Sequence, residues 1–319
     1  MKGLVIKSTG SSHWVYTPEG ETIECKIKGN FRIRGIRSTN PVAVGDYVEV
    51  VQQEDGTNWI TDIEDRKNYI VRRSTNLSKE SHILAANLDQ VALIVTINHP
   101  VTSTTFIDRF LATCEAYRVP AVLIFNKIDL LTEEELEQLA DLRALYESLG
   151  YPTYAISAKR LNDNDDENEN ELDALFSGKI TLLSGNSGVG KSTLLNAIFG
   201  EEKTRTGLIS SAHDKGMHTT TFSEMYPLNS EALNSQPTGW LIDTPGIKGF
   251  GAINMEKEEV SHYFREIFRI GDGCKYSNCL HTGERGCVVE DAVVRGDIAV
   301  SRFESYLSLL GDCDEGKYR

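Results

Sequence analysis

A glycine-rich loop lies between an apolar segment, KITLL, and a segment with helical spacing, TLLNAIF. The loop, GNSGVGKST, matches the pattern G-x-x-x-x-G-K-[ST], in which glycines let successive backbone N–H groups surround phosphate oxygens. That pattern requires a strand before the loop and a helix after it, and both contexts are present here. We therefore expect a phosphate site made by Gly185, Asn186, Ser187, Gly188, Val189, Gly190, Lys191, Ser192 and Thr193.

Two motifs predict how the phosphates and a magnesium ion would be held. The Lys191 ammonium is expected to reach the β- and γ-phosphates and to act in catalysis, and the Ser192 hydroxyl to bind Mg²⁺. The motif DTPG follows the apolar segment WLI, so Asp243 should lie at the end of a strand beside the Mg²⁺ shell. Gly246 of the same motif can offer its backbone N–H to the γ-phosphate.

A carboxylate directly after the apolar segment AVLIF points to guanine as the base. Asp129 of the motif NKID can accept from both N1–H and the exocyclic amino group of guanine, a donor pair that adenine lacks. Asn126 can bond the base edge, and the stem of Lys127 can cover the ring. A second guanine segment follows the apolar stretch YAI and would supply a backbone N–H through its middle residue: Ser157, Ala158 and Lys159.

The order of these motifs is inverted relative to Ras-like GTPases, because NKID and SAK precede the phosphate loop and DTPG. This order resembles that of a circularly permuted GTPase. From about residue 90, apolar segments of strand length alternate with helical ones, which predicts a mainly parallel, doubly wound α/β sheet. A capping box at Thr132 and Glu135 predicts a helix over 133–149, and the segment EEVSHYFREIF predicts an amphipathic helix near residue 260.

The segment between the phosphate loop and DTPG should contain the switch threonine that ligates Mg²⁺, with Thr220 or Thr219 as the candidate. The residue after DTPG is Ile247, and an apolar side chain cannot orient the attacking water as the glutamine of Ras-like enzymes does. His218 lies next to the threonine pair and is the nearest candidate for that catalytic role. The alternative is a loop histidine without a catalytic role.

The chain is acidic overall, with 33 Lys and Arg against 47 Asp and Glu, but its charged residues are unevenly distributed along the sequence. The acidity is concentrated in residues 162–173, which we interpret as a solvated loop. Residues 1–68 contain several short strand-like segments separated by turn residues, which favours a small β-barrel of the OB type. In and after the segment KIKGNFRIRG, basic side chains form either a phosphate-tracking surface or a solvated strand face: Lys26, Lys28, Arg32, Arg34 and Arg37.

Three cysteines and one histidine occur within 14 residues as C-x4-C-x-H-x5-C. Three thiolates and an imidazole suit a tetrahedral structural Zn²⁺ ion: Cys274, Cys279, His281 and Cys287. A disulfide or unconnected reduced thiols are the alternatives. Four basic residues nearby could contact RNA phosphates or be solvated surface: Arg265, Arg269, Lys275 and Arg285.

Taken in order, the barrel, the permuted motifs, GMHTTT, DTPG followed by Ile, and CKYSNCLHTGERGC resemble the RsgA (YjeQ) family over the whole chain. The resemblance implies an OB-like RNA-binding domain over 1–68, a permuted GTPase domain over 69–250 and a helical zinc-binding domain over 251–319. It also implies a cytoplasmic GTPase that acts in late maturation of the small ribosomal subunit, is stimulated by that subunit, contacts its rRNA and is released on hydrolysis. The family's histidine before the switch threonines corresponds to His218.

Two other functions remain open at this point. One is a GTP-gated RNA-binding checkpoint module whose hydrolysis is incidental, and the other is a GTPase of large-subunit assembly. The motif NKID disfavours an ATP-dependent phosphotransferase. The chain has no apolar stretch of about 20 residues and no signal-peptide core, so no membrane association is expected. A monomer is the default expectation.

Overall fold

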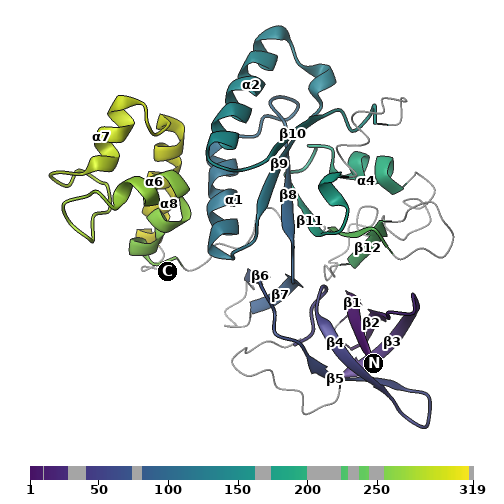
Figure 1. The fold of residues 1–319 in the computed structure, drawn as a ribbon. Helices are drawn as coiled ribbons and strands as arrows, with labels where there is room; N and C mark the ends of the chain where they lie inside the picture. The colour runs from purple at the N-terminus through teal and green to yellow at the C-terminus, as the bar shows by residue number, and fades with distance from the viewer. Residues whose placement is uncertain are drawn as a thin grey trace.

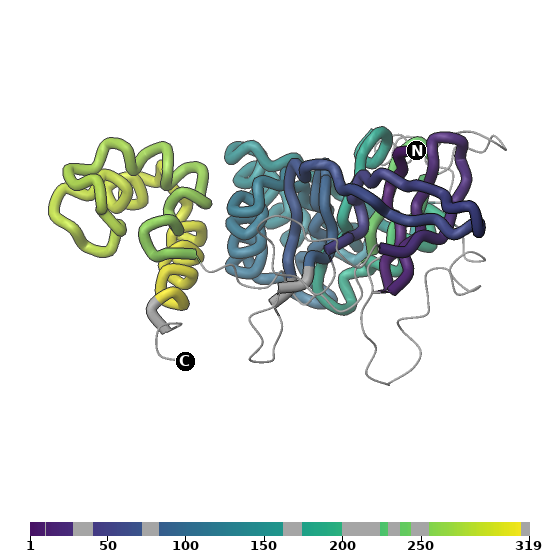
Figure 2. The backbone as a smooth tube through the Cα atoms, turned by 90° about the horizontal axis from the view of Figure 1, so that it is seen from below, coloured from purple at the N-terminus to yellow at the C-terminus, as the bar shows by residue number. Residues whose placement is uncertain are grey.

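The computed structural model describes residues 1–9, 11–27, 41–73, 81–161, 174–199, 224–228, 237–243 and 255–315. Within these ranges the chain forms a β-barrel, an α/β sheet and a group of C-terminal helices (Figure 1). Figure 2 shows the barrel and the C-terminal helices at opposite ends, with the α/β sheet between them. No described helix is long and apolar enough to cross a membrane.

The N-terminal barrel is closed by five strands. They are β1 (Lys2–Ser8), β2 (His13–Tyr16), β3 (Thr22–Ile27), β4 (Tyr47–Gln52) and β5 (Asn58–Ile63). The pairing runs β1-β2-β3-β5-β4, and β4 returns to β1, so no strand edge is left open. Alternate residues such as Val5, Val15 and Ile60 fill the interior. The predicted small barrel is confirmed, whereas the segment FRIRGI lies outside the described residues.

A two-stranded hairpin that the sequence analysis did not predict connects the barrel to the larger sheet. Its strands are β6 (Tyr69–Arg73) and β7 (Ser81–Ala86), paired antiparallel. Asn68 and Asn87 fix this connection, because the Asn68 amide bonds both backbone groups of Leu88 and the Asn87 amide donates to the carbonyl of Gly45.

The larger sheet has the predicted parallel order. Its strands are β8 (Gln90–Val95), β9 (Ala121–Asn126), β10 (Thr153–Ile156), β11 (Ile180–Ser184), β12 (Glu224–Leu228) and β13 (Gly239–Asp243). They lie in the order β10-β9-β8-β11-β13-β12, all parallel except β12, which pairs antiparallel with β13. Strands β8, β9, β11 and β13 are buried throughout, as expected for strands covered on both faces.

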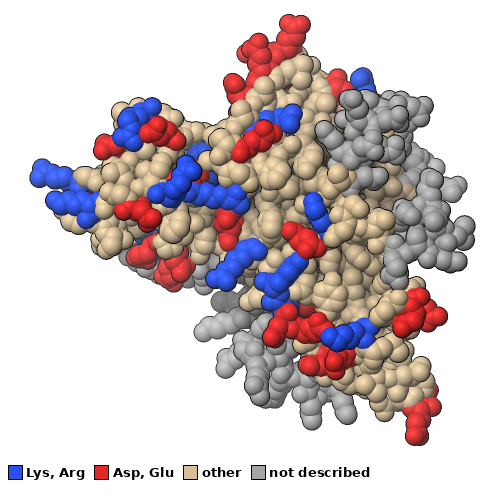
Figure 3. Space-filling view, in the orientation of Figure 1, with Lys and Arg blue, Asp and Glu red and all other residues tan. Residues whose placement is uncertain are grey.

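Helices cover both faces of this sheet. Helices α1 (Thr104–Ala116) and α2 (Glu133–Ser148) pack on one face, and α4 (Lys191–Phe199) packs on the other. The predicted capping box starts α2, since the side chains of Thr132 and Glu135 bond each other's backbone N–H. Acidic side chains gather over α2 at the top of Figure 3, in agreement with its acidic first turn.

The C-terminal helices are η2 (Lys257–Tyr263), α6 (Arg265–Gly271), α7 (Val288–Arg295) and α8 (Val300–Glu315). The expectation of one amphipathic helix near residue 260 is wrong, because the chain is extended at Phe264 between η2 and α6. The Phe264 ring is fully buried against Tyr306 and under the guanidinium of Arg302. Burying this ring in the local core outweighs continuation of the helix.

The C-terminal helices are joined to α1 by a buried ionic network. Arg302 on α8 donates to Asp108 of α1 at 2.9 Å and to Glu266 of α6 at 2.6 Å. Ser305 and Tyr146 also donate to the Asp108 carboxylate, so all five side chains of the network have partners within the protein. Burial raises the pKa of Asp108, and the Arg302 charge opposes this shift.

Arg265, a possible RNA contact in the sequence analysis, connects α6 to α1 and to the end of α2. Its guanidinium pairs with Glu115 at 2.7 Å and donates to the carbonyls of Leu149 and Gly150 at the end of α2. It also lies 4.0 Å from the ring centroid of Tyr151. Its donors bond groups of the protein while the side chain stays 38% exposed, so a contact with RNA phosphates stays a prediction.

Candidate nucleotide-binding site and metal centre

The phosphate loop connects β11 to the first residue of α4, as its sequence pattern predicts. Three of its glycines have positive φ, +150° at Gly185, +84° at Gly188 and +99° at Gly190. A Cβ atom on Gly185 would lie 2.5 Å from the carbonyl oxygen of Ile94. Because neither this backbone conformation nor this space suits a side chain, glycine is required for the loop to lie against β8.

The ammonium of Lys191 lies over the loop and donates to the carbonyl of Gly185 at 2.6 Å. Burial lowers the pKa of Lys191, and the nearby Asp243 carboxylate opposes that shift. Ser192 and Thr193 follow in the first turn of α4 and are exposed, so the Ser192 hydroxyl is available to a ligand. The loop thus brings a cation and a helix N-terminus to one concave backbone.

Asn126 joins the guanine motif to the phosphate loop. Its Nδ2 donates to the carbonyl of Val189 at 2.8 Å, and its Oδ1 accepts from the backbone N–H of Ala158 at 2.9 Å. A Cβ atom on Gly190 would lie 2.3 Å from the same Nδ2. The described contacts of this buried amide hold the two motifs together, and its bond to the base edge stays a prediction.

Lys127 makes a second bridge between the motifs. Its backbone is left-handed with φ +67°, and its Nζ donates to the carbonyl of His99 at 2.5 Å and to that of Gly188 at 2.6 Å. No sequence pattern points to His99, because the group involved is a backbone carbonyl. NKID and the phosphate loop, which are about 60 residues apart in the chain, are thus in direct contact.

Asp129 lies at the same edge of the sheet in the short helix η1 (Ile128–Leu130) and is half-buried. Its Oδ1 accepts from the hydroxyl of Ser157 at 2.5 Å, which orients the carboxylate and joins NKID to SAK. The backbone N–H of Ala158 is already used by Asn126, and Lys159 is exposed. The other oxygen of this carboxylate has no partner among the described residues, so it is available to a donor pair.

The metal side of the site is described in part. Asp243 ends β13 and is buried, opposite Leu183 on β11, just before the phosphate loop. A carboxylate and the Ser192 hydroxyl are hard oxygen donors of the kind that Mg²⁺ prefers, so the donor set fits this ion. His218, Thr219, Thr220 and Gly246 lie outside the described residues.

At the other end of the molecule, the ligand atoms of the predicted zinc site lie within 4.8 Å of one another: Cys274, Cys279, His281 and Cys287. The His281 Nδ1 is 3.7 Å from the Cys274 sulfur and 3.4 Å from the Cys287 sulfur. Tetrahedral coordination by zinc separates sulfur and nitrogen ligands by about 3.5 Å, so the spacing fits. All six cysteines of the chain are free thiols, which excludes a disulfide here.

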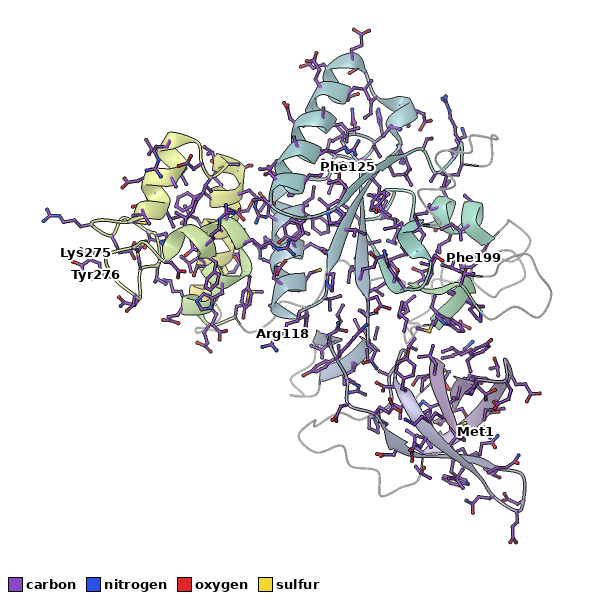
Figure 4. The ribbon with its side chains drawn as sticks, viewed as in Figure 1. Met1, Arg118, Phe125, Phe199, Lys275 and Tyr276 are labelled. Atoms are coloured by element: carbon purple, nitrogen blue, oxygen red, sulfur yellow. The ribbon has the colours of Figure 1, made fainter. Side chains whose placement is uncertain are left out.

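The zinc-type cluster is supported by the surrounding loop. Glu284 accepts from the backbone N–H groups of Leu280 and Thr282, and the Tyr306 hydroxyl donates to the carbonyl of Leu280. These bonds shape the turn that presents the imidazole of His281. Figure 4 shows Lys275 and Tyr276 at the outer edge of this region, with the Lys275 Nζ 5.3 Å from the ring centroid.

Comparisons with known proteins agree with this geometry. A family model described as RsgA GTPase matches residues 63–253, and one described as RsgA N-terminal domain matches residues 2–60. A protein named small ribosomal subunit biogenesis GTPase RsgA, from Phocaeicola vulgatus, is 60% identical over 319 residues, 100% of this chain and 99% of the relative. The chain belongs to the RsgA family. A relative in Bacteroides thetaiotaomicron, named RsgA 2, is 58% identical over the same shares of the two chains.

Two solved RsgA-type structures share the fold. YjeQ from Thermotoga maritima has a TM-score of 0.74 at 34% identity and covers 98% of both chains. YloQ, described as a circularly permuted GTPase, has a TM-score of 0.74 at 26% identity, covering 100% of this chain and 96% of that one. The permuted order predicted from the sequence is therefore the order of the RsgA family, and the chain is a GTPase of that fold.

The RNA candidates on the barrel are described only in part. Lys26 lies on β3 with its side chain exposed, next to the buried Cys25. The remaining candidates lie outside the described residues: Lys28, Arg32, Arg34 and Arg37. Sequence reasoning also missed Arg302, whose burial gives no signal in a chain where most arginines are exposed.

Proposed function

We propose that this GTPase acts in maturation of the small ribosomal subunit and that the subunit stimulates its turnover. The observation that carries the nucleotide site is the pair of bridges from Asn126 and Lys127 to the phosphate loop, which bring the guanine motif and the phosphate loop into direct contact. The relatives are named small ribosomal subunit biogenesis GTPases, which supports the ribosomal role and does not favour large-subunit assembly. A cytoplasmic location follows from that partner.

The contacts proposed for the base, the phosphates and Mg²⁺ are made by described residues, except that of the switch threonine, which is assigned from its sequence motif. Asp129, oriented by Ser157, binds the N1–H and amino group of guanine. Lys191 exchanges its bond to the Gly185 carbonyl for the β- and γ-phosphates, where its charge stabilises the transition state. Ser192, Asp243 and one switch threonine, Thr220 or Thr219, hold Mg²⁺, which neutralises phosphate charge.

Two further residues complete the proposed site. Gly246 donates its N–H to the γ-phosphate, so the segment after β13 responds to the presence of that phosphate. His218 orients the attacking water, a role that Ile247 after DTPG is unable to fill. Replacing His218 by alanine should lower stimulated turnover at least about tenfold while nucleotide affinity is kept.

The Cys274, Cys279, His281 and Cys287 cluster is proposed to hold one structural zinc ion. With four protein ligands there is no open coordination position, so the ion stabilises the fold and takes no part in hydrolysis. The barrel and the zinc region are proposed to contact rRNA, with Lys26, Lys28, Arg32, Arg34 and Arg37 on the barrel.

The function is tested by phosphate release from GTP and from ATP, each with no ribosomal subunit, with purified small subunits and with purified large subunits. We expect GTP turnover to be low alone and strongly raised by small subunits only, with ATP inactive throughout. Binding of GTP without any stimulation would support the checkpoint function instead. Stimulation by large subunits alone would contradict the proposal.

A further inference from the structure

A lysine of the barrel forms an ion pair with the strand of the α/β sheet next to β13, which ends at Asp243 of the proposed nucleotide site. Lys7, near the end of β1, is paired with Glu224, the first residue of β12, and this is the bridge between the two strands. The Lys7 Nζ lies 3.0 Å from the Glu224 Oε1 and 5.5 Å from the ring centroid of Trp14 in the barrel. Figure 1 shows β1 and β12 side by side at this boundary.

Glu224 is directly opposite Asp243 on β13. Directly opposed residues of antiparallel strands project to the same face, with Cβ atoms about 5 Å apart. Tyr226 is on that face too, because it lies two residues after Glu224 on the same strand and its hydroxyl donates to the Glu224 Oε2 at 3.4 Å. Its ring lies 6.1 Å from that of Phe199 on α4, so the shared face is the one that carries the phosphate-loop helix (Figure 4).

Lys7 on β1, Glu224 on β12 and Asp243 on β13 are therefore neighbours across the sheet, with Glu224 between the other two. Asp243 is the carboxylate assigned to the Mg²⁺ shell, and its charge acts on Lys191. A second carboxylate beside it would repel nucleotide phosphates unless a cation offsets its charge. The only cation that the described residues place on Glu224 is Lys7, which belongs to the barrel.

The barrel is held at this position by apolar contacts as well. Leu4 of β1 is buried in the same core as β8, β11 and β13, and Tyr16 packs edge-on against Trp240 at 5.1 Å between ring centroids. Lys7 thus lies on a strand, β1, that packs against the α/β sheet, and this packing holds its half-exposed ammonium beside Glu224.

We propose that Lys7 is a positioning residue for nucleotide binding, which neutralises Glu224 beside Asp243 and so makes the charge of the phosphate edge depend on the docked barrel. This inference rests on the proposed nucleotide site. Displacement of the barrel by a partner would leave the Glu224 carboxylate without its cation next to Asp243, and the uncompensated negative charge would favour release of the nucleotide. Because this effect is electrostatic, removing the charge of Lys7 and removing the charge of Glu224 should change the nucleotide affinity in opposite directions.

The test measures the affinity of the full chain for fluorescently labelled GDP with excess Mg²⁺ and again with EDTA. Lys7→Gln should weaken binding in EDTA about threefold or more, since one negative charge is uncovered near the phosphates. Glu224→Gln should strengthen binding in EDTA by a similar factor, and the double variant Lys7→Gln/Glu224→Gln should return near wild type. Because the pair is half-exposed, these substitutions should change stability little.

Lys2→Gln is the matched control, because Lys2 pairs with Glu64 at the other end of the same strand. It should leave the affinity unchanged. If Lys7→Gln and Glu224→Gln shift the affinity in the same direction, the pair is only a structural tie and the proposal is wrong. A shift by Lys7→Gln no larger than that by Lys2→Gln would also overturn it. Failure of the wild-type chain to bind GDP would instead refute the nucleotide site itself.

Discussion

Gly190 shows how one residue can hold two motifs together. Its φ of +99° and the 2.3 Å between a built Cβ and the Asn126 Nδ2 leave no room for a side chain. We expect Gly190→Ala to weaken GDP binding at least about tenfold, because the phosphate loop would be pushed away from NKID. Fluorescence titration of labelled GDP measures the effect.

Gly178→Ala is the control for that experiment. Gly178 also has a positive φ, +72°, but no atom lies within 4 Å of its built Cβ. Gly178→Ala should therefore introduce backbone strain but no steric clash. We expect it to lower the free energy of unfolding by about 1 kcal/mol and to leave the nucleotide affinity unchanged. Equal losses of affinity in the two variants would mean that the Asn126 contact is unimportant.

His13 gives the barrel a pH dependence. The imidazole is fully buried, neither of its nitrogens has a hydrogen-bond partner in the described part of the chain, and burial lowers its pKa to about 4. The unfolded chain takes up a proton near pH 6.5 while the folded chain does so only near pH 4. Stability should therefore fall as the pH drops through this window, by up to about 1.4 kcal/mol per unit from this group.

Urea unfolding followed at pH 7, 6, 5 and 4 measures this dependence. His13→Leu should flatten the pH profile in that window, whereas His262→Gln, which changes an exposed histidine, should leave it as in wild type. An unchanged slope in the His13 variant would show that other groups cause the acid sensitivity.

At the scale of elements, a buried ionic network joins α1 to α8. Removing one of its charges should lower the free energy of unfolding strongly, whereas replacing all of its charges by apolar side chains should lower it little. Removing the Arg302 charge leaves the buried carboxylates of Asp108 and Glu266 without their cation. We expect Arg302→Met to lower the free energy of unfolding by about 3–5 kcal/mol, measured by urea unfolding.

The triple variant Arg302→Met/Asp108→Leu/Glu266→Met is the comparison. It removes all three charges together, so most of the lost stability should return. If the triple variant is no more stable than Arg302→Met, the loss comes from packing rather than from uncompensated charge. Arg109→Met, which breaks an exposed bond to Asp312 at the same boundary, should cost about 1 kcal/mol or less.

At the scale of the whole molecule, the zinc-type cluster and the nucleotide site lie in different parts of the chain, connected through α1 and the C-terminal helices. Removing the metal with a chelator should open the C-terminal region, because its core packs directly around Cys274, Cys279 and Cys287. Hydrogen exchange should rise about tenfold or more in residues 257–295 and little in β8 or β11.

Elemental analysis of protein purified without added metal should find about one zinc per chain, and Cys279→Ser should lose it. Cys313→Ser is the control, since Cys313 lies outside the cluster. Zinc-free wild-type protein with an ordered C-terminal region would contradict the assignment.

Local patterns in the chain were enough to predict the barrel, the alternating α/β sheet, the permuted motif order and the four zinc-type ligands. Each depends on short-range signals: glycines where backbone must approach backbone, apolar runs of strand length, and ligand spacing within 14 residues. The capping box of α2 was predicted for the same reason, because its two bonds join residues three apart.

Contacts between distant segments were decided only by the tertiary structure. The inward use of Asn126, the break at Phe264, the burial of Arg302 and the bridge from Lys7 to Glu224 all join groups with no local signature. Arg265 and Arg302 read the same as surface arginines in sequence, and only the fold decides that Arg302 is buried among carboxylates while Arg265 pairs with Glu115 and stays partly exposed. A side chain's chemistry is set by its own atoms, whereas its role depends on neighbours that the fold supplies.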